Sequence, residues 1–203
     1  MFYDAVKNDH GLPNDPFKAI VVPRPIGWIS TLSRDGKSNL APYSYFNAFS
    51  QAPHYVAYGS GISHASGSKD SITNVEETGE FVVNLATWDL REAVNKSSAN
   101  LPYGTDEFEV AGLSKAACRM VKPPRVAESP VALECRWFKT IDLPGDDGKV
   151  RDRMVIGRVA GIHIDDRYIE NGRVNTAALR PIARLGYAEY ATVNEVWRMR
   201  RPD

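Results

Sequence analysis

The sequence contains few of the side chains that hold metal ions. Its 203 residues include two cysteines, Cys118 and Cys135, and four histidines. The cysteines form no C-x-x-C motif, and no two histidines have the i, i+4 spacing that would place both on one face of a helix. We therefore expect small buried thiols and no metal site, so that any redox chemistry needs an organic cofactor.

Net charge and long apolar runs are also missing. The 25 lysines and arginines balance 25 aspartates and glutamates, so no global field attracts nucleic acid or an anionic membrane. The N-terminal residues lack the apolar core of a signal peptide, and no run approaches the ~20 apolar residues of a membrane span. The expectation is a soluble cytoplasmic protein that binds neither nucleic acid nor membrane.

Strand-like runs dominate what is present. They are rich in β-branched and aromatic residues and are bounded by turn residues. They cover residues 27–32, 38–42, 54–58, 81–85, 131–140, 154–164 and 195–199. No repeat or linker divides the chain, so the pattern predicts one mainly β domain over residues 1–203, a closed or partly closed barrel with a few helices.

Helix signals interrupt these strands at three places. One helix is expected over 71–78 with Gly79 as its stop, a second opening at Asp89 with Glu92 at capping-box spacing, and a third over 177–184. Gly157 and Gly161 inside a strand predict either a bulge or close packing. The irregular segment 99–129 is typical of an interface or of a wrap around a partner.

A loop of serine and glycine, residues 59–68, ends at Lys69, where the first helix begins. Hydroxyl groups, the N–H groups of a first helical turn and a neighbouring cation together suit a phosphate. A solvated serine-rich loop before an ordinary helix explains the same residues, and no Walker or dinucleotide fingerprint accompanies them. An anion site is therefore one of two interpretations here.

An aromatic segment, residues 43–47, precedes that loop. Its alternation places Tyr43, Tyr45 and Asn47 on one face of a strand, with Ser44 and Phe46 on the other. A planar ring could stack on the aromatic groups while the hydroxyl and amide meet its polar edge, as an isoalloxazine requires. Aromatic side chains of a barrel core are the alternative.

Together these segments resemble the flavin reductase-like family, the FMN-binding split barrels that include flavoredoxin-type proteins and reductase components of two-component monooxygenases. The chain is longer than the minimal monooxygenase reductases. The resemblance spans about residues 18–190. It is carried by PRPIGWIST (23–31), NLAPYSYFN (39–47), KDS (69–71), TGEFVVN (78–84), VKPPR (121–125) and RLG (184–186).

The resemblance implies FMN bound at the interface of a homodimer. The residues that would face the flavin ring are Thr31, Ser44, Tyr45, Phe46 and Asn47. Those that would serve the ribityl chain and phosphate are Ser60, Lys69, Ser71 and Asn74, with Asn84 as a weaker candidate. Ser71 stands where relatives often carry threonine, and the hydroxyl group is kept.

The activity implied is that of an FMN-dependent oxidoreductase. NADH or NADPH would give a hydride to the flavin, which would pass electrons to a free flavin, a protein or a small acceptor. Because the cofactor performs the bond-making, we predict no catalytic acid or base. Arg184 is a candidate contact for an anionic substrate, with an ordinary surface arginine as its alternative.

Two other classes compete with this enzyme. A non-enzymatic FMN carrier of the flavoredoxin type needs the same residues, so the sequence leaves enzyme and carrier open. A barrel that binds single-stranded nucleic acid needs a basic groove, which the balanced charge argues against.

Overall fold

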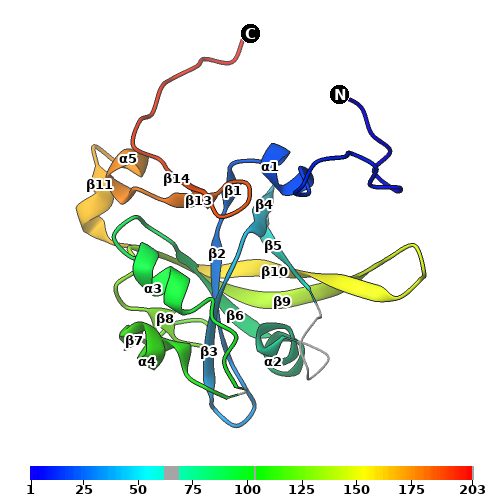
Figure 1. The fold of residues 1–203 in the computed structure, drawn as a ribbon. Coiled ribbons are helices and arrows are strands. Elements are labelled where there is room, and N and C mark those ends of the chain that lie inside the picture. The colour runs from blue at the N-terminus through cyan, green and yellow to red at the C-terminus, as the bar shows by residue number, and fades with distance from the viewer. Residues whose placement is uncertain (62–68, 103, 203) are drawn as a thin grey trace.

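The computed structural model describes residues 1–61, 69–102 and 104–202. Its main element is an antiparallel sheet in the order β3-β2-β6-β9-β10-β5-β4 (Figure 1). These strands are β2 (Gly27–Leu32), β3 (Ser38–Tyr43), β4 (Tyr45–Gln51), β5 (His54–Gly61), β6 (Glu80–Leu85), β9 (Val131–Pro144) and β10 (Val150–Ile164).

The two edges of this sheet are joined by a single residue. Strand β3 ends at Tyr43 and β4 begins at Tyr45, yet the two strands stand at opposite ends of the strand order. Ser44 alone cannot span the width of a flat sheet, so the sheet must curl until its edges approach. Since no ladder of the described residues pairs β3 with β4, the barrel stays open along this seam.

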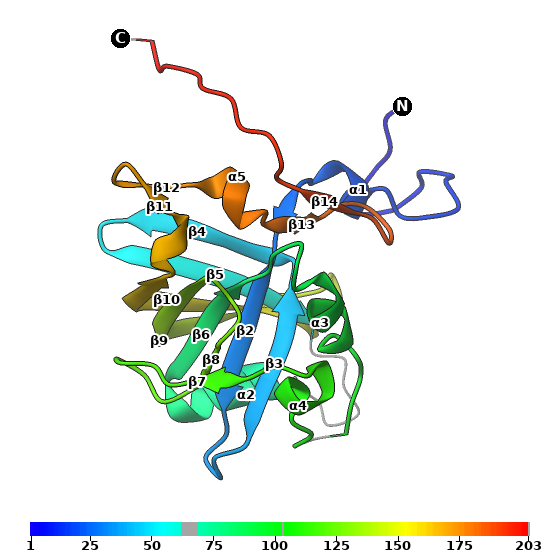
Figure 2. The same ribbon diagram turned by 90° about the vertical axis from the view of Figure 1, so that its left-hand side faces the viewer.

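Three smaller sheets accompany the barrel. Strands β1 (Arg24–Pro25), β13 (Ile182–Arg184) and β14 (Tyr190–Thr192) form one of them, beside α1 (Phe17–Ile20), at the end from which both termini extend (Figure 2). Two short pairs complete the strands: β7 (Lys115–Ala116) with β8 (Arg125–Val126), and β11 (Ile169–Glu170) with β12 (Arg173–Val174). A 3-10 turn, η1 (Asp166–Tyr168), precedes β11.

The helices are short. They are α2 (Asp70–Thr78), α3 (Arg91–Lys96), α4 (Glu107–Ala111) and α5 (Thr176–Leu179). Helix α2 starts one residue before its predicted position and stops at Gly79, whose φ of 76° is the left-handed conformation that glycine tolerates. Within the described residues, no helix is long and apolar enough to cross a membrane.

Three local predictions were wrong. The helix expected from Asp89 begins at Arg91, because the Asp89 carboxylate pairs with Arg180 at 3.4 Å instead of capping. The helix expected over 177–184 ends at Leu179, because Arg180 turns left-handed and the next residue is proline. Residues 195–199, expected as a strand, form no ladder and follow β14 as an exposed extension.

Two apolar clusters hold the barrel. The first lies between the sheet and α2 and includes the buried Tyr58, Ile72, Phe81 and Val155. Gly157 is part of this packing, since a Cβ atom there would lie 2.3 Å from Phe81 Cζ. The pairing of β9 with β10 also shifts register at Gly157, so the predicted bulge and close packing both occur.

The second cluster lies between the β2–β3 hairpin and the helices α3 and α4. Trp28 is its largest member, is fully buried, and donates a 2.9 Å hydrogen bond from Nε1 to Ser97 Oγ. Leu40, Phe108 and Val126 pack around it. The segment 99–129 therefore covers the barrel through α4, β7 and β8.

Candidate functional site

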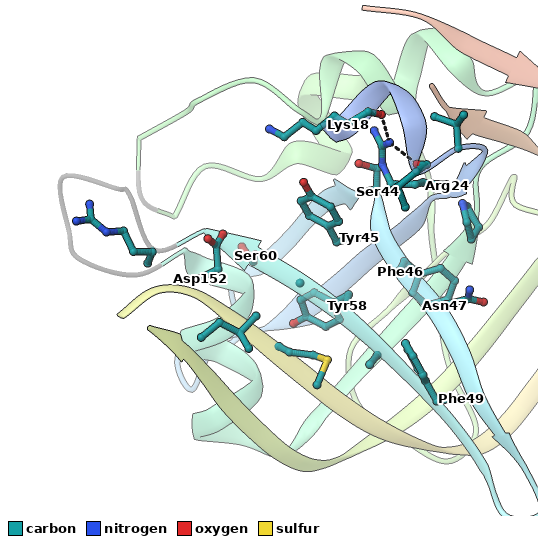
Figure 3. A pocket seen from close by; sticks show the side chains of 18 of the residues that line it. Lys18, Arg24, Ser44, Tyr45, Phe46, Asn47, Phe49, Tyr58, Ser60 and Asp152 are labelled. Atoms are coloured by element: carbon teal, nitrogen blue, oxygen red, sulfur yellow. Dashed lines mark hydrogen bonds between the residues drawn. The ribbon is translucent and has the colours of Figure 1, made fainter. Parts of the chain in front are cut away.

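A cavity of about 990 Å³ lies against the open edge of the barrel. Strand β4 supplies Tyr45, Phe46 and Asn47, and β5 supplies Tyr58 and Ser60, as Figure 3 shows. Residues 18–25 close one end, and residues 143–145 and 151–154 of the β9–β10 hairpin form another wall. The volume is at the upper end of the range of sites for organic ligands.

Five of the predicted flavin-contacting residues are in this wall. They are Ser44, Tyr45, Phe46, Asn47 and Ser60. Two glycines set the position of the aromatic pair: a Cβ at Gly27 would lie 2.7 Å from Phe46, and one at Gly59 would lie 3.1 Å from Tyr45 Cβ. Because β4 is an edge strand, Tyr45 keeps 43% of its surface exposed toward the opening.

Arg24 fixes the end of the cavity that residues 18–25 form. Its buried guanidinium donates hydrogen bonds to the carbonyls of Lys18 (2.5 Å), Val21 (2.7 Å) and Leu185 (2.9 Å). It also lies 5.8 Å from the centroid of the Tyr45 ring. Arg24 therefore positions the backbone that carries the exposed Lys18 side chain (Figure 3).

A second group of predicted residues lies in the interior behind β4. The Tyr43 hydroxyl donates to Ser71 Oγ (2.8 Å), which donates to Asn39 Oδ1 (2.8 Å). Thr31 lies 3.5 Å from the same Asn39 oxygen and accepts a 3.0 Å hydrogen bond from Asn74 Nδ2. Burial raises the pKa of Tyr43 to about 12, so the phenol keeps the proton that this chain of hydrogen bonds uses.

Thr31, Ser71 and Asn74 are thus almost inaccessible, with 0%, 1% and 3% of their surfaces exposed. Lys69 and Ser71 line a separate cavity of about 80 Å³ at the start of α2, where Lys69 Nζ lies 5.4 Å from the Tyr43 ring centroid. The predicted phosphate loop is outside the described residues over 62–68. Ser60 and Lys69, at the two described ends of this loop, both interact with Tyr43.

Asn84 has a different environment. Its side chain is fully buried, donates to the Trp28 carbonyl (3.0 Å) and Ser30 Oγ (3.2 Å), and accepts from the Val126 N–H (2.8 Å). The amide nitrogen therefore binds β2, and the amide oxygen attaches β8 to the barrel. The structure separates Asn84 from the predicted site residues and gives it a role in the fold.

Arg184 lies in a neighbouring cavity of about 520 Å³, which shares Lys18, Arg24, Ser44 and Tyr45 with the large one. Its guanidinium donates to the Tyr190 hydroxyl (2.5 Å) and to the Tyr187 carbonyl, and lies 4.5 Å from the Tyr190 ring centroid. Arg184 is thus held against two tyrosines at an opening that communicates with the main site.

Sequence reasoning missed several residues of the cavity wall. Arg24 lies inside the PRP segment but was given no role. Tyr58 was expected only as part of a strand, and its buried hydroxyl has no hydrogen-bond partner among the described residues. Asp152 and Met154 reach the site because β10 pairs them with Gly61 and Gly59 of β5. Such long-range pairing leaves no local signal.

The flavin reductase like domain model matches residues 20–181, so the chain belongs to the flavin reductase-like family. Nitrilotriacetate monooxygenase component B from Bacillus cereus is 31% identical, with a TM-score of 0.84 over 90% of both chains. The 2-nitrobenzoate 2-nitroreductase of Pseudomonas fluorescens is 26% identical, with a TM-score of 0.79 over 91% of this chain and 88% of that one.

A third solved structure identifies the fold. It is a flavin reductase with a split barrel domain from Shewanella frigidimarina, 20% identical, with a TM-score of 0.79 over 91% of this chain and 89% of its own. The expected mainly β split barrel is therefore confirmed. The missing ladder between β3 and β4 is what leaves the barrel split in the described part of this chain.

Proposed function

We propose that this protein binds FMN in the large cavity and acts as an oxidoreductase that takes reducing equivalents from NADH or NADPH and passes them to an acceptor. Its membership of the flavin reductase-like family supports a flavin-related redox role. The names of the Bacillus cereus and Pseudomonas fluorescens neighbours support an oxidoreductase. One observation carries the proposal: aromatic and polar residues of β4 and β5 line a single cavity that is large enough for a flavin.

The residues present fit FMN in kind. Tyr45 and Phe46 offer aromatic surface for the ring, while Ser44, Asn47 and the Tyr58 hydroxyl offer hydrogen bonds for its polar edge. Lys69 and the first turn of α2 would hold the phosphate. Bound FMN supplies the redox chemistry itself. Thr31, Ser71 and Asn74 act indirectly, by fixing β2 and β3 to α2.

A homodimer would complete this site. The cavity opens along β4, an edge strand on which Tyr45 and Phe49 keep 43% and 67% of their surfaces exposed. A second copy over this edge would cover both aromatic side chains and enclose the bound ring. Arg184, in the adjoining cavity, is placed to meet an anionic group on a substrate that enters beside the flavin.

Anaerobic mixing tests the reductase activity. The protein is loaded with FMN, freed of unbound flavin and mixed with NADH or NADPH in a stopped-flow spectrometer. We expect loss of the oxidised-flavin absorbance with at least one nucleotide, at a rate that increases with nucleotide concentration. Loading without any reduction by either nucleotide would reject the reductase and leave the FMN site standing.

The alternative function is a non-enzymatic FMN carrier. The exposed aromatic side chains at the mouth of the cavity also suit the docking of a redox protein. Under this alternative, dithionite reduces the bound flavin and both nucleotides fail to do so.

A further inference from the structure

Three side chains from distant parts of the chain meet on the β9–β10 pair. Cys118 lies between β7 and β8, Glu134 lies in β9 and His163 lies in β10. One donor atom from each, a thiol sulfur, a carboxylate oxygen and an imidazole nitrogen, lies within 4.8 Å of the other two. None of the three lines the cavities described above. The cluster is therefore separate from the proposed flavin site.

Glu134 is held in one orientation. Only 1% of its surface is exposed, and its carboxylate accepts hydrogen bonds from the N–H groups of Arg119 (2.9 Å), Met120 (2.5 Å) and Val121 (3.2 Å). Hydrogen bonds of this kind orient the carboxylates that coordinate metal ions.

His163 completes the arrangement. Its Nε2 contacts Glu134 Oε1. Both atoms carry lone pairs, so this contact needs a proton between the imidazole nitrogen and the carboxylate oxygen. A cation can take the place of this proton and draw on both atoms. The His163 side chain is 23% exposed, so the cluster opens to solvent on that side and a water molecule can reach a fourth position.

We propose that Cys118 Sγ, Glu134 Oε1 and His163 Nε2 bind one divalent cation of the Zn²⁺ class, with water as the fourth ligand. In a tetrahedral Zn²⁺ site with usual bond lengths, such ligand atoms lie about 3.4–3.6 Å apart. The three donor atoms here lie within 4.8 Å of one another, so small side-chain rotations bring them to that spacing. A thiolate with an imidazole selects Zn²⁺ over Mg²⁺ or Ca²⁺. The thiolate and the carboxylate together cancel the charge of the ion.

The ion would attach the segment that carries Cys118 to β9 and β10. That segment, residues 115–126, has the two-residue strands β7 and β8 as its regular structure. It also contains the N–H groups of Arg119, Met120 and Val121, which already donate to Glu134. Binding releases the thiol proton.

Cobalt titration of the full-length protein tests the site. Protein stripped with a chelator is titrated with Co²⁺, and difference spectra are recorded so that flavin absorbance cancels. We expect one equivalent of Co²⁺ to produce a thiolate-to-cobalt band that Zn²⁺ removes. Cys118→Ser should abolish the band, His163→Gln should weaken Co²⁺ binding at least ~10-fold, and Cys135→Ser, in the barrel core, should leave it unchanged.

A second measurement needs no variant. Alkylation of the native protein, followed by mass spectrometry, should modify the partly exposed Cys118 before the buried Cys135. Zn²⁺ at a concentration near that of the protein should slow the modification of Cys118. A native protein that gives no thiolate band and the same Cys118 alkylation rate with and without Zn²⁺ would overturn the metal site. Neither readout depends on FMN.

Discussion

Replacing Lys69 by alanine tests where the phosphate of FMN binds. Lys69 is half-buried, caps the N-terminal end of the nine-residue helix α2 and has its ammonium group 5.4 Å from the Tyr43 ring centroid. A charge-assisted contact with a phosphate in this position contributes about 1.5–3 kcal/mol, or roughly ten- to a hundredfold in FMN affinity. Riboflavin has no phosphate, so the same substitution should change its affinity little.

Fluorescence quenching titrations with both flavins supply the assay. Lys18→Ala is the matched variant, since Lys18 lines the large cavity whereas Lys69 lines the separate small one; this substitution should affect FMN and riboflavin alike. Salt should weaken FMN binding to the native protein more than to Lys69→Ala. Equal losses for the two flavins in Lys69→Ala would show that Lys69 acts through the fold. A loss of affinity for FMN but not for riboflavin in Lys18→Ala would instead place the phosphate beside Lys18.

Four further outcomes are expected. Tyr45→Ala should weaken FMN binding by ~1–3 kcal/mol while Tyr55→Ala, outside the cavity, should not, as measured by flavin titration of folded protein. Gly157→Ala should lower the free energy of unfolding in urea by ~1–3 kcal/mol because the methyl group meets Phe81, and an unchanged midpoint would contradict that packing. Burial raises the pKa of Glu107 above its usual value of 4.5, so the folded protein binds the proton more tightly than the unfolded chain, and stability is lost as pH rises through the folded-state pKa. Glu107→Gln should therefore be more stable than the native protein near pH 7. In thermal melts at acid pH the difference should vanish. Light scattering at micromolar concentration should give a dimer, and a monomer with FMN bound would reject the enclosed site.

Much of the barrel could be predicted because its strands carry local signals. The run 27–32 is β2 to the residue, and the Arg34-Asp35-Gly36-Lys37 turn closes its hairpin with Gly36 at a φ of 78°. The failures have different causes. Asp89 pairs with Arg180 instead of capping a helix, and the left-handed Arg180 followed by Pro181 ends the helix predicted over 177–184. Residues 195–199 find no partner strand among the described residues.

The candidate site divides in the same way. Residues 44–47 are consecutive in the chain and all four line the cavity, although their predicted alternation divides them between two faces of a strand. Thr31 and Ser71 were placed at the flavin by resemblance, whereas the structure buries both in hydrogen bonds behind the strand. Asp152 in the opposite wall and His163 in its cluster with Cys118 and Glu134 are brought into place by the long β10 pairing, which no spacing in the sequence reveals.

The visible spectrum of the purified protein tests the central claim most directly. The protein is incubated with excess FMN, separated from unbound flavin by gel filtration and scanned before and after denaturation. We predict the absorbance bands of oxidised flavin in the protein fraction, close to one flavin per chain, released on denaturation as FMN. A colourless protein fraction, together with no quenching of FMN fluorescence in a direct titration, would contradict the assignment of the β4–β5 cavity as a flavin site.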